Sequence, residues 1–259
     1  MSRLADVQTF IDCSRRAGSA GELDLLMQEI SREMGFDHFA LMHHVDLRPF
    51  GPIDGPVLNR EFIALSNYPQ FWIDHYVATE IVNHDPVLLA SQRTNVGFGW
   101  GQLPELITLS PQHVEILERS RHAGIADGFT VPANVPGEHN GSCNFAVRTG
   151  REAPSANFSM AQLIGSFAFQ AARLLVARER LPGRDGPAGL TPRQLECIVL
   201  AARGKTDWEI AQILGIGEET VKQHFADARA RYKVPKRMQV VLRAIYDGHV
   251  ALSEVLGQR

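Results

Sequence analysis

Apolar residues recur at two different periods along the first 180 residues, and these periods predict a domain of mixed helices and strands. Apolar positions three and four apart indicate helices, whereas alternation of apolar and polar positions indicates strands. Four helices are predicted with both ends, near 4–16, near 20–34, from Ser110-Pro111 to about His122, and over 158–180. Two more are predicted to begin at Tyr68-Pro69 and at Asp85-Pro86. The predicted strands are 37–45, 61–66, 128–135 and 142–149, with a loop over 48–56. This order predicts an α/β fold, an α-β-α sandwich in which helices flank a sheet.

The predicted helix 158–180 has more apolar side chains than one sheet face needs. Phe169 is expected to lie off its apolar face. That face consists of Met160, Leu163, Ile164, Phe167, Ala171, Leu174 and Leu175. Either part of the helix faces a second subunit or the whole helix is deeply buried in its own domain, and the sequence leaves both interpretations open.

Residues 181–189, LPGRDGPAG, contain three glycines, two prolines and two charges. A segment of this composition cannot bury apolar surface and is typical of an interdomain linker. We therefore predict one domain over 1–180 and a second over 190–259.

The pattern after this linker predicts an all-α unit of four helices. A Thr followed three residues later by Gln or Glu is a capping box, and this motif marks helix starts at Thr191 and Thr206. Gly215 ends the second of these helices. The next helix has an apolar stripe of Val221, Phe225, Ala228 and Tyr232, and its opposite face carries Lys222, Gln223, Arg229 and Lys233. Two helices around a tight turn fit a helix-turn-helix DNA reader. Periodicity alone fits a helical hairpin with a solvated charged face equally well.

Composition narrows the possible classes of protein. No run of 18 apolar residues occurs, so no membrane span is expected. The N-terminus lacks a secretory signal pattern, and the three cysteines are far apart, which suits free thiols in a reducing cytoplasm. Residues 190–259 hold 11 Lys and Arg against 8 Asp and Glu, a net charge of +3, while residues 1–189 hold 15 against 21, a net charge of −6. A basic C-terminal unit beside an acidic partner suits a nucleic-acid-binding end and a regulatory end.

Motifs for catalysis and metal binding are absent from the sequence. There is no nucleophile elbow, phosphate-binding glycine loop or pair of catalytic carboxylates, so no catalytic residue is assigned and an enzyme is not expected. The histidines include His43-His44 and the pair His75 and His84, but no pair has metal-ligand spacing supported by a third residue. We expect neither a metal nor a cofactor.

Residues 190–241 resemble the C-terminal DNA-binding domain of LuxR/FixJ-type transcription factors, without a gap. The matched residues are Leu190-Thr191-Pro192-Arg193, Gly204-Lys205-Thr206, Glu209-Ile210-Ala211, Leu214, Thr220-Val221-Lys222, His224, Val234 and Arg237. Gln194 replaces the family's usual Glu, and Gly217 replaces a Ser, which weakens the predicted helix cap. The run Arg231-Tyr232-Lys233 replaces a Lys-Leu-Gly-like run, and we expect Tyr232 to pack with its hydroxyl at the surface.

The resemblance favours the DNA reader over the hairpin and implies double-stranded promoter DNA as a partner. Lys222 and Gln223 are the candidates for base contacts. The other candidate DNA-binding residues are Thr206, Thr220, Arg229, Lys233, Lys236 and Arg237, of which the last four are expected to hold phosphates or, for Arg237, the last helix.

The N-terminal domain lacks the clustered acidic residues of a phospho-receiver. It resembles instead the autoinducer-binding domain of quorum-sensing LuxR-type receptors. The residues that carry this resemblance are Tyr68-Pro69, Trp72, Tyr76, Asp85-Pro86, Trp100 and the segment GIADGFTVP with Gly124 and Gly128.

The resemblance implies an acyl-homoserine lactone as the ligand, with a role for each polar side chain. Trp72 would donate to the lactone carbonyl, Asp85 would accept from the amide N–H, and Tyr68 would reach the amide carbonyl. Tyr76 and Trp100 would form the wall of the pocket. A helix N-cap role for Asp85, and plain core packing for Trp72 and Tyr76, remain open alternatives.

Asn144 falls where relatives often place Ser or Thr against the amide carbonyl of the ligand. Asn can donate to a carbonyl, but it is larger than Ser and is also an acceptor. We expect it to tune the preference for the 3-position or the acyl chain.

The sequence therefore predicts a cytoplasmic, ligand-gated transcription factor that binds DNA as a homodimer, with RNA polymerase as a further partner. Three alternatives remain: an orphan regulator that answers a different small molecule, a ligand-independent DNA-binding protein, and a catalytic domain fused to a DNA reader. The sequence leaves open the length of the ligand's acyl chain, the substituent at its 3-position, and whether the protein activates or represses transcription.

Overall fold

The computed structural model describes residues 3–50, 53, 55–58, 62–79, 81–136, 138–178, 190–251 and 254–255. The chain divides into two compact units. One comprises Met1–Val135 with His139–Arg180, and the other contains Leu181–Arg259. The predicted linker 181–189 lies outside the described residues, so the predicted domain boundaries stay a prediction.

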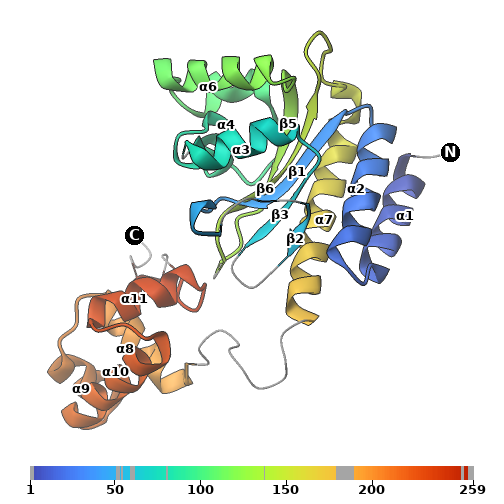
Figure 1. Ribbon diagram of the computed structural model, residues 1–259. Coiled ribbons are helices and arrows are strands. Elements are labelled where there is room, and N and C mark those ends of the chain that lie inside the picture. The colour runs from blue at the N-terminus through green and yellow to red at the C-terminus, as the bar shows by residue number, and fades with distance from the viewer. Residues whose placement is uncertain are drawn as a thin grey trace. The chain divides into compact units, whose positions relative to one another are not determined.

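The first unit combines helices with one sheet (Figure 1). Its helices are α1 (Arg3–Arg16), α2 (Ala20–Glu33), α3 (Gln70–Ala78), α4 (Pro86–Ser91), α5 (Leu103–Leu106), α6 (Pro111–His122) and α7 (Phe158–Arg178). Its strands are β1 (His38–His43), β2 (Val57–Leu58), β3 (Ile63–Ser66), β4 (Phe98–Gly99), β5 (Asp127–Pro132) and β6 (Gly141–Val147).

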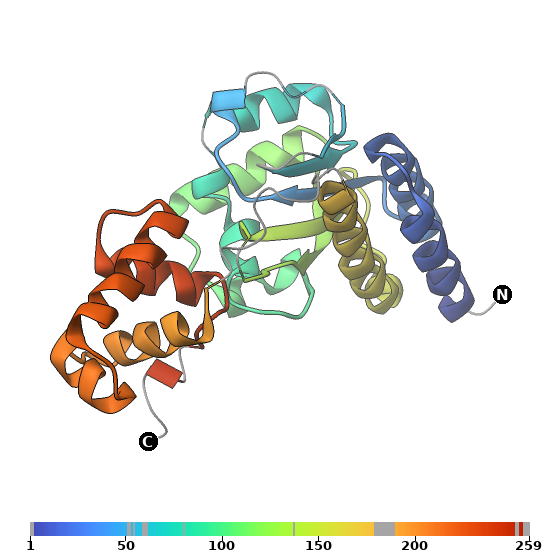
Figure 2. The same cartoon turned by 90° about the horizontal axis from the view of Figure 1, so that it is seen from below.

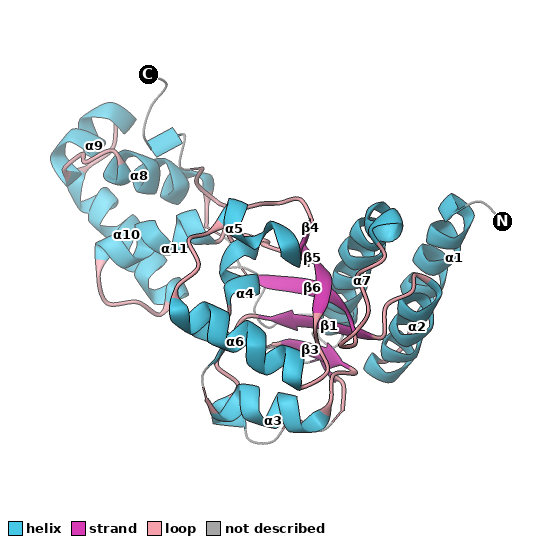
Figure 3. Cartoon of the chain, turned by 90° about the horizontal axis from the view of Figure 1, so that it is seen from above, coloured by secondary structure: helices cyan, strands magenta, loops and turns pink. Residues whose placement is uncertain are grey.

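The sheet separates two groups of helices. Its strand order is β2-β3-β1-β6-β5-β4, and all its strand pairs are antiparallel. Helices α1, α2 and α7 lie on one side and α3 to α6 on the other (Figure 3). This arrangement confirms the predicted sandwich of helices around a sheet.

Alternation along the strands sends neighbouring residues to opposite helical layers. Leu41, Phe129 and Phe145 belong to the large core that includes Ile164 of α7, and Leu41 and Phe145 are fully buried. Ala40, Asn144 and Thr130 are direct cross-strand partners in one row across β1, β6 and β5. This row faces the opposite layer, where α3 to α6 lie.

Helix α7 buries a residue that was predicted to lie off its apolar face. Phe169 was predicted to lie off the apolar face, but it is 2% exposed and its ring lies 5.3 Å from that of His43. The lack of a Cβ at Gly141 makes room for it, because a Cβ there would lie 2.4 Å from the Phe169 ring. Leu163 and Leu174, which belong to the predicted apolar face, are 40% and 41% exposed. The helix packs against α1 as well as the sheet (Figure 2), and this second contact widens the buried arc beyond what one sheet face would bury.

Some short elements were missed. Strands β2 and β4 contain two residues each and therefore carry no period that a sequence pattern could show. Helix α3 begins at Gln70, with Pro69 as its N-cap, rather than at Tyr68-Pro69. The predicted helix starts at Pro86 and Pro111 are confirmed, with Asp85 and Ser110 as their N-caps.

The second unit consists of α8 (Pro192–Ala202), α9 (Asp207–Leu214), α10 (Glu218–Tyr232) and α11 (Arg237–Tyr246). Both predicted capping boxes are present, at Thr191 and at Thr206. Gly217 caps α10 without a side-chain bond, and Lys233 ends it in the left-handed conformation at φ 53°. The buried residues of this unit form a core of their own.

Tyr232 packs against this core, but its hydroxyl is buried and has no hydrogen-bond partner among the described residues. The prediction that this hydroxyl lies at the surface is wrong. Burial raises the pKa of Tyr232 to about 12.

Candidate ligand pocket and nucleic-acid interface

A cavity of about 230 Å³ lies in the first unit between the sheet and the layer of α3 to α6. The six predicted ligand-binding residues all line it: Tyr68, Trp72, Tyr76, Asp85, Trp100 and Asn144. They are up to 76 positions apart in the sequence, from Tyr68 to Asn144, and the fold brings them together. Most of the remaining lining is apolar, from Ala40 and Met42 on β1 to Ile116 and Leu117 on α6.

Small residues of the sheet form the floor of this cavity. Ser66, Ala40 and Asn144 follow one another as cross-strand partners on β3, β1 and β6, and all three line the cavity. Their short side chains leave space above the strands, and the aromatic side chains of α3 close that space from the other side.

Helix α3 contributes Trp72 and Tyr76, one turn apart. Their rings are 6.1 Å apart at 62°, an edge-on contact. Tyr68 precedes the helix, and its ring makes an edge contact with His38 at 5.9 Å. Tyr68 is therefore not part of an aromatic stack along one helix, although it lines the same cavity.

Asp85 is the acidic group of the cavity. Its Oδ1 accepts from the backbone N–H of Val87 at 2.8 Å, so it caps α4, and its Oδ2 accepts from the Tyr76 hydroxyl at 3.0 Å. Burial raises the pKa of Asp85, and the bonds from Val87 and Tyr76 oppose that change. Burial and the nearby Asp85 carboxylate raise the pKa of Tyr76, so its hydroxyl stays protonated and donates. The N-cap alternative is thus confirmed, and the free lone pairs of the carboxylate can still accept a further bond.

Two donors of the cavity have no partner in the protein. Within the described part of the chain, neither the Trp72 indole N–H nor the Tyr68 hydroxyl hydrogen-bonds to any residue. Burial raises the pKa of Tyr68 well above its ordinary value, so the hydroxyl keeps its proton. Both residues line the cavity, and a ligand with two acceptors would satisfy both donors.

Trp100 is held against the sheet by a hydrogen bond and by a glycine. Its indole Nε1 donates to Thr130 Oγ1 at 2.9 Å, and Thr130 Oγ1 donates to Asn144 Oδ1 at 2.8 Å. Gly128 lets the indole approach β5, because a Cβ there would lie 3.0 Å from the Trp100 ring and 2.3 Å from the Phe145 carbonyl. The sequence pattern did not indicate a role for Thr130. Its position opposite Asn144 in the strand register could have indicated it once the pairing of β5 and β6 was known.

In the second unit, α9 and α10 form the predicted helix-turn-helix, with Gly215 at φ 66° in the turn. Thr220, Lys222, Gln223 and Arg229 are exposed on α10. Lys222 Nζ lies 2.7 Å from Glu219 and 3.3 Å from Glu218, and Gln223 donates to Asp227 at 2.7 Å. Both candidates for base contacts thus bond to acidic neighbours on their own helix.

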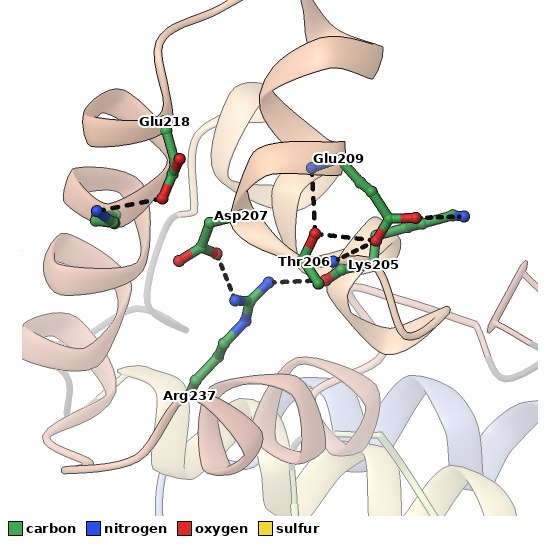
Figure 4. Close-up of polar contacts among 7 residues, drawn as sticks. Lys205, Thr206, Asp207, Glu209, Glu218 and Arg237 are labelled. Carbon is green, nitrogen blue, oxygen red and sulfur yellow. Dashed lines mark hydrogen bonds and ion pairs between the residues drawn. The ribbon is translucent and has the colours of Figure 1, made fainter.

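Arg237 and Thr206 have structural contacts (Figure 4). Arg237 pairs with Asp207 and donates to the Lys205 carbonyl at 3.3 Å, and its guanidinium lies 4.2 Å from the centre of the Phe225 ring. This supports the alternative role of Arg237, in which it holds the last helix. Thr206 Oγ1 accepts from the Glu209 N–H at 3.3 Å and caps α9.

The two other predicted phosphate contacts, Lys233 and Lys236, are exposed at the junction of α10 and α11. Among the described residues, no group of three or more His, Cys, Asp or Glu side chains could hold a metal ion. Within the same residues, no helix has the length and apolar character needed to cross a membrane. Cys13, Cys143 and Cys197 are free thiols.

A pocket with unsatisfied donors in one unit and a helix-turn-helix in the other define a small-molecule receptor joined to a DNA reader. Residues 19–172 match the family described as autoinducer binding domain, and residues 188–244 match the bacterial regulatory proteins of the luxR family. The chain belongs to the LuxR family of quorum-sensing transcriptional regulators.

Relatives of established role are transcriptional regulators rather than enzymes. The quorum sensing-dependent regulator RpaR of Rhodopseudomonas palustris is 29% identical over 192 residues, which cover 74% of this chain and 76% of RpaR. The transcriptional activator AhyR of Aeromonas hydrophila is 25% identical over 219 residues, 83% of this chain and 80% of AhyR.

Solved structures show the same fold. Escherichia coli SdiA superposes with a TM-score of 0.68 at 22% identity, covering 95% of this chain and 98% of that one. SdiA in complex with octanoyl-rac-glycerol superposes with a TM-score of 0.69 at 23% identity, covering 95% and 96%.

Proposed function

We propose that this protein binds an acyl-homoserine lactone in the cavity of its first unit. The observation that carries the proposal is the set of polar groups around the cavity: two donors without partners, on Tyr68 and Trp72, and one buried acceptor, Asp85. An acyl-homoserine lactone offers two carbonyl oxygens and one amide N–H, which is the complementary set. The apolar residues between α6 and β1 suit the acyl chain.

In this proposal each polar group keeps the role that the resemblance implied. The Trp72 indole donates to the lactone carbonyl, Asp85 accepts from the amide N–H, and the Tyr68 hydroxyl donates to the amide carbonyl. The Tyr76 hydroxyl donates to Asp85 at 3.0 Å and so fixes the acceptor. Ligand binding would satisfy the donors and stabilise the first unit through linkage.

Thermal melting of the full chain with a panel of acyl-homoserine lactones tests the proposal. A ligand at about 100 times its Kd should stabilise the protein by ~2.7 kcal/mol. Trp72→Phe should weaken binding about tenfold, because it removes one buried hydrogen bond and keeps the ring. Trp208→Phe is the matched control, because Trp208 is 62% exposed on α9 of the other unit. The proposal fails if folded protein shows no shift with any chain length.

A different acyl compound is the second candidate ligand. The structure of SdiA with octanoyl-rac-glycerol shows that this fold can hold an acyl chain on a glycerol headgroup. Glycerol hydroxyls can also accept from Trp72 and Tyr68 and donate to Asp85. An acylglycerol in the same melting panel separates an orphan regulator of this kind from a lactone receptor.

We further propose that the protein binds promoter DNA as a homodimer. Helix-turn-helix proteins place two recognition helices in successive major grooves of a dyad site. The exposed Leu163 and Leu174, with the half-buried Met160 and Phe167, form an apolar stripe along α7 that supports a contact with a second copy of the chain. This favours the sequence interpretation in which part of that helix faces another subunit.

RNA polymerase is proposed as the further partner of the DNA-bound protein. The support is a pair of exposed apolar side chains on α9, Trp208 at 62% and Ile213 at 54% exposure. Tryptophan is enriched at protein–protein interfaces relative to the rest of the protein surface. Trp208→Ala should lower transcription from a bound promoter without changing DNA affinity, measured by in vitro transcription beside a gel-shift assay.

A further inference from the structure

The hydrogen bonds around Asn144 have only one possible direction. The backbone carbonyl of Ala40 can only accept, so the atom of Asn144 that lies 3.3 Å from it must be the amide nitrogen. The Asn144 oxygen therefore faces Thr130, and Thr130 must donate to it at 2.8 Å. The Trp100 indole, which can only donate, gives its N–H to the same Thr130 oxygen at 2.9 Å.

Asn144 and Thr130 use every side-chain donor that they have within the protein. One Asn144 N–H goes to Ala40 and the other to Ser142 Oγ, at 3.0 Å. Thr130 has a single hydroxyl proton, and Asn144 accepts it. Asn144 and Thr130 consequently have no donor left for a carbonyl of a ligand, although Asn144 lines the cavity.

This series of hydrogen bonds ends at His44. Ser142 Oγ lies 2.9 Å from Nε2 of the half-buried His44. Burial lowers the pKa of His44 to about 3, so the ring is neutral at physiological pH. Trp100 is thereby linked through Thr130, Asn144 and Ser142 to the end of β1.

Trp100 stands between two cavities. It lines the ligand cavity of about 230 Å³ and also a second cavity of about 430 Å³, which is more open to solvent. Leu117 lines both as well. The second cavity continues from there to polar residues that include Arg121 and Asp127. The indole of Trp100 and the side chain of Leu117 are thus the partition between the two spaces.

We propose that Asn144 is a positioning residue that sets the size limit of the ligand. It fixes Thr130, Thr130 fixes the indole of Trp100, and the indole keeps the second cavity closed to the ligand. This differs from the expectation that Asn144 donates to the ligand's amide carbonyl. The selectivity part of the inference rests on the proposed ligand binding, while the orientation of Trp100 does not.

Thr130 provides the sharpest test, because it is fully buried and does not line the ligand cavity. Any effect of Thr130 on ligand choice must therefore pass through its neighbours. Thr130→Val keeps the shape and removes the hydroxyl, whereas Thr130→Ser keeps the hydroxyl and is the matched control. Asn144→Leu removes the acceptor of the same bond.

The first measurement is fluorine NMR of the full chain labelled with fluorotryptophan, without ligand. The chain has three tryptophans, and the Trp100 signal is assigned by Trp100→Phe. We expect Thr130→Val and Asn144→Leu to shift or broaden the Trp100 signal alike, and Thr130→Ser to leave it near that of the parent. An unchanged Trp208 signal shows that the other unit has kept its fold.

The second measurement is the ratio of affinities for a straight-chain and a bulky aromatic acyl-homoserine lactone. Thr130→Val and Asn144→Leu should each reduce the discrimination against the bulky ligand about tenfold, and the double variant should do no more than either. If Asn144 instead bonds the ligand directly, Asn144→Leu will lose affinity while Thr130→Val behaves as the parent, and the proposal is overturned. A Trp100 signal that is unchanged in folded Thr130→Val also overturns it. If no ligand binds the parent, the proposed ligand is wrong, and the NMR result still decides the role of Asn144.

Discussion

At the residue scale, Asp85 shows how one side chain can serve the fold and the ligand. One carboxylate oxygen caps α4 through Val87, and the other bonds to Tyr76 at the cavity. A sequence reading has to choose between a helix cap and a ligand contact for such a residue. In the structure the cap uses one oxygen, and the other oxygen, bonded to Tyr76, is left for the proposed ligand contact.

Asp85→Asn should stabilise the ligand-free protein at neutral pH. Burial raises the folded-state pKa of Asp85, so its carboxyl favours the fold fully below the unfolded pKa of about 3.9. That contribution is lost as pH rises through the folded pKa. Asn keeps an oxygen for the cap and carries no charge. We expect a higher melting temperature at pH 7, a gain that shrinks toward pH 4, and a smaller ligand-induced shift.

Asp85→Ala is the control for this prediction. It removes the cap of α4 along with the charge, and the lost cap costs about 1 kcal/mol. An Asp85→Asn protein that melts below the parent at neutral pH would contradict the assignment of a buried, costly carboxylate.

Lys233 occupies a backbone conformation that suits glycine. Its φ is 53°, and it is the one residue other than glycine with positive φ among those described. The left-handed conformation costs a residue with a Cβ about 1 kcal/mol. We expect Lys233→Gly to raise the stability of the second unit by about that amount, measured by denaturant unfolding followed through Trp208 fluorescence.

Lys233→Ala separates strain from charge, because it keeps the Cβ and removes the ammonium. It should not gain stability. If Lys233 also contacts a phosphate, both variants should lower the slope of log affinity against log salt by about 0.9. Equal stability of the Gly and Ala variants would contradict the strain.

At the element scale, α9 depends on its N-terminal cap and on α11. Thr206 and Glu209 bond each other reciprocally, and Arg237 at the start of α11 pairs with Asp207 in the first turn of α9. These contacts fix the helix against which α10, the second helix of the helix-turn-helix, packs. A residue that resembles a DNA contact in sequence, such as Arg237, can therefore act by orienting the reader.

Glu209→Gln should make the second unit less sensitive to acid. The backbone N–H of Thr206, with Lys205, lowers the pKa of Glu209 from 4.5 to about 2. The stabilising contribution of this carboxylate is thus present above the unfolded pKa and is lost as pH falls through the folded pKa. Unfolding followed at Trp208 between about pH 5 and pH 2 should show a shallower loss for Glu209→Gln than for the parent. Glu196→Gln, which removes an exposed partner of Arg193, is the control.

At the scale of the whole molecule, the apolar stripe of α7 connects the fold of one chain to the proposed dimer. Leu163 and Leu174 occupy surface that the first unit leaves uncovered, although α7 also packs on α1 and the sheet. A second copy that covers this stripe would join two DNA readers.

We expect Leu163→Glu with Leu174→Glu to shift the full chain to monomer and to weaken binding to a dyad site. Placing charge in an apolar contact disfavours association, and a monomer can fill only one half-site. Sedimentation velocity and gel shifts on a dyad operator measure the two effects. Leu25→Glu, at a 66% exposed position on α2, is the matched control. A double variant that remains dimeric would place the interface elsewhere.

The sequence by itself determined the elements with a long period or a local cap. The helical period and the alternation of strands predicted the sandwich of helices around a sheet. The capping boxes at Thr191 and Thr206 were confirmed, because a cap is built from residues three positions apart. The family motif also named six side chains that line one cavity, from Tyr68 to Asn144. Each of these features is recorded in residue type and short-range spacing.

The tertiary structure alone decided whatever depends on the pairing of distant strands. Strand register puts Thr130 opposite Asn144. The Asn144 amide therefore accepts from the Thr130 hydroxyl and donates to the Ala40 carbonyl. Contacts with His43 and with Gly141, which has no Cβ, bury Phe169 against the sheet, while Leu163 on the same helix is 40% exposed, and one helical period could not separate the two. Trp100 lines two cavities at once, and that position between them is a property of the folded chain.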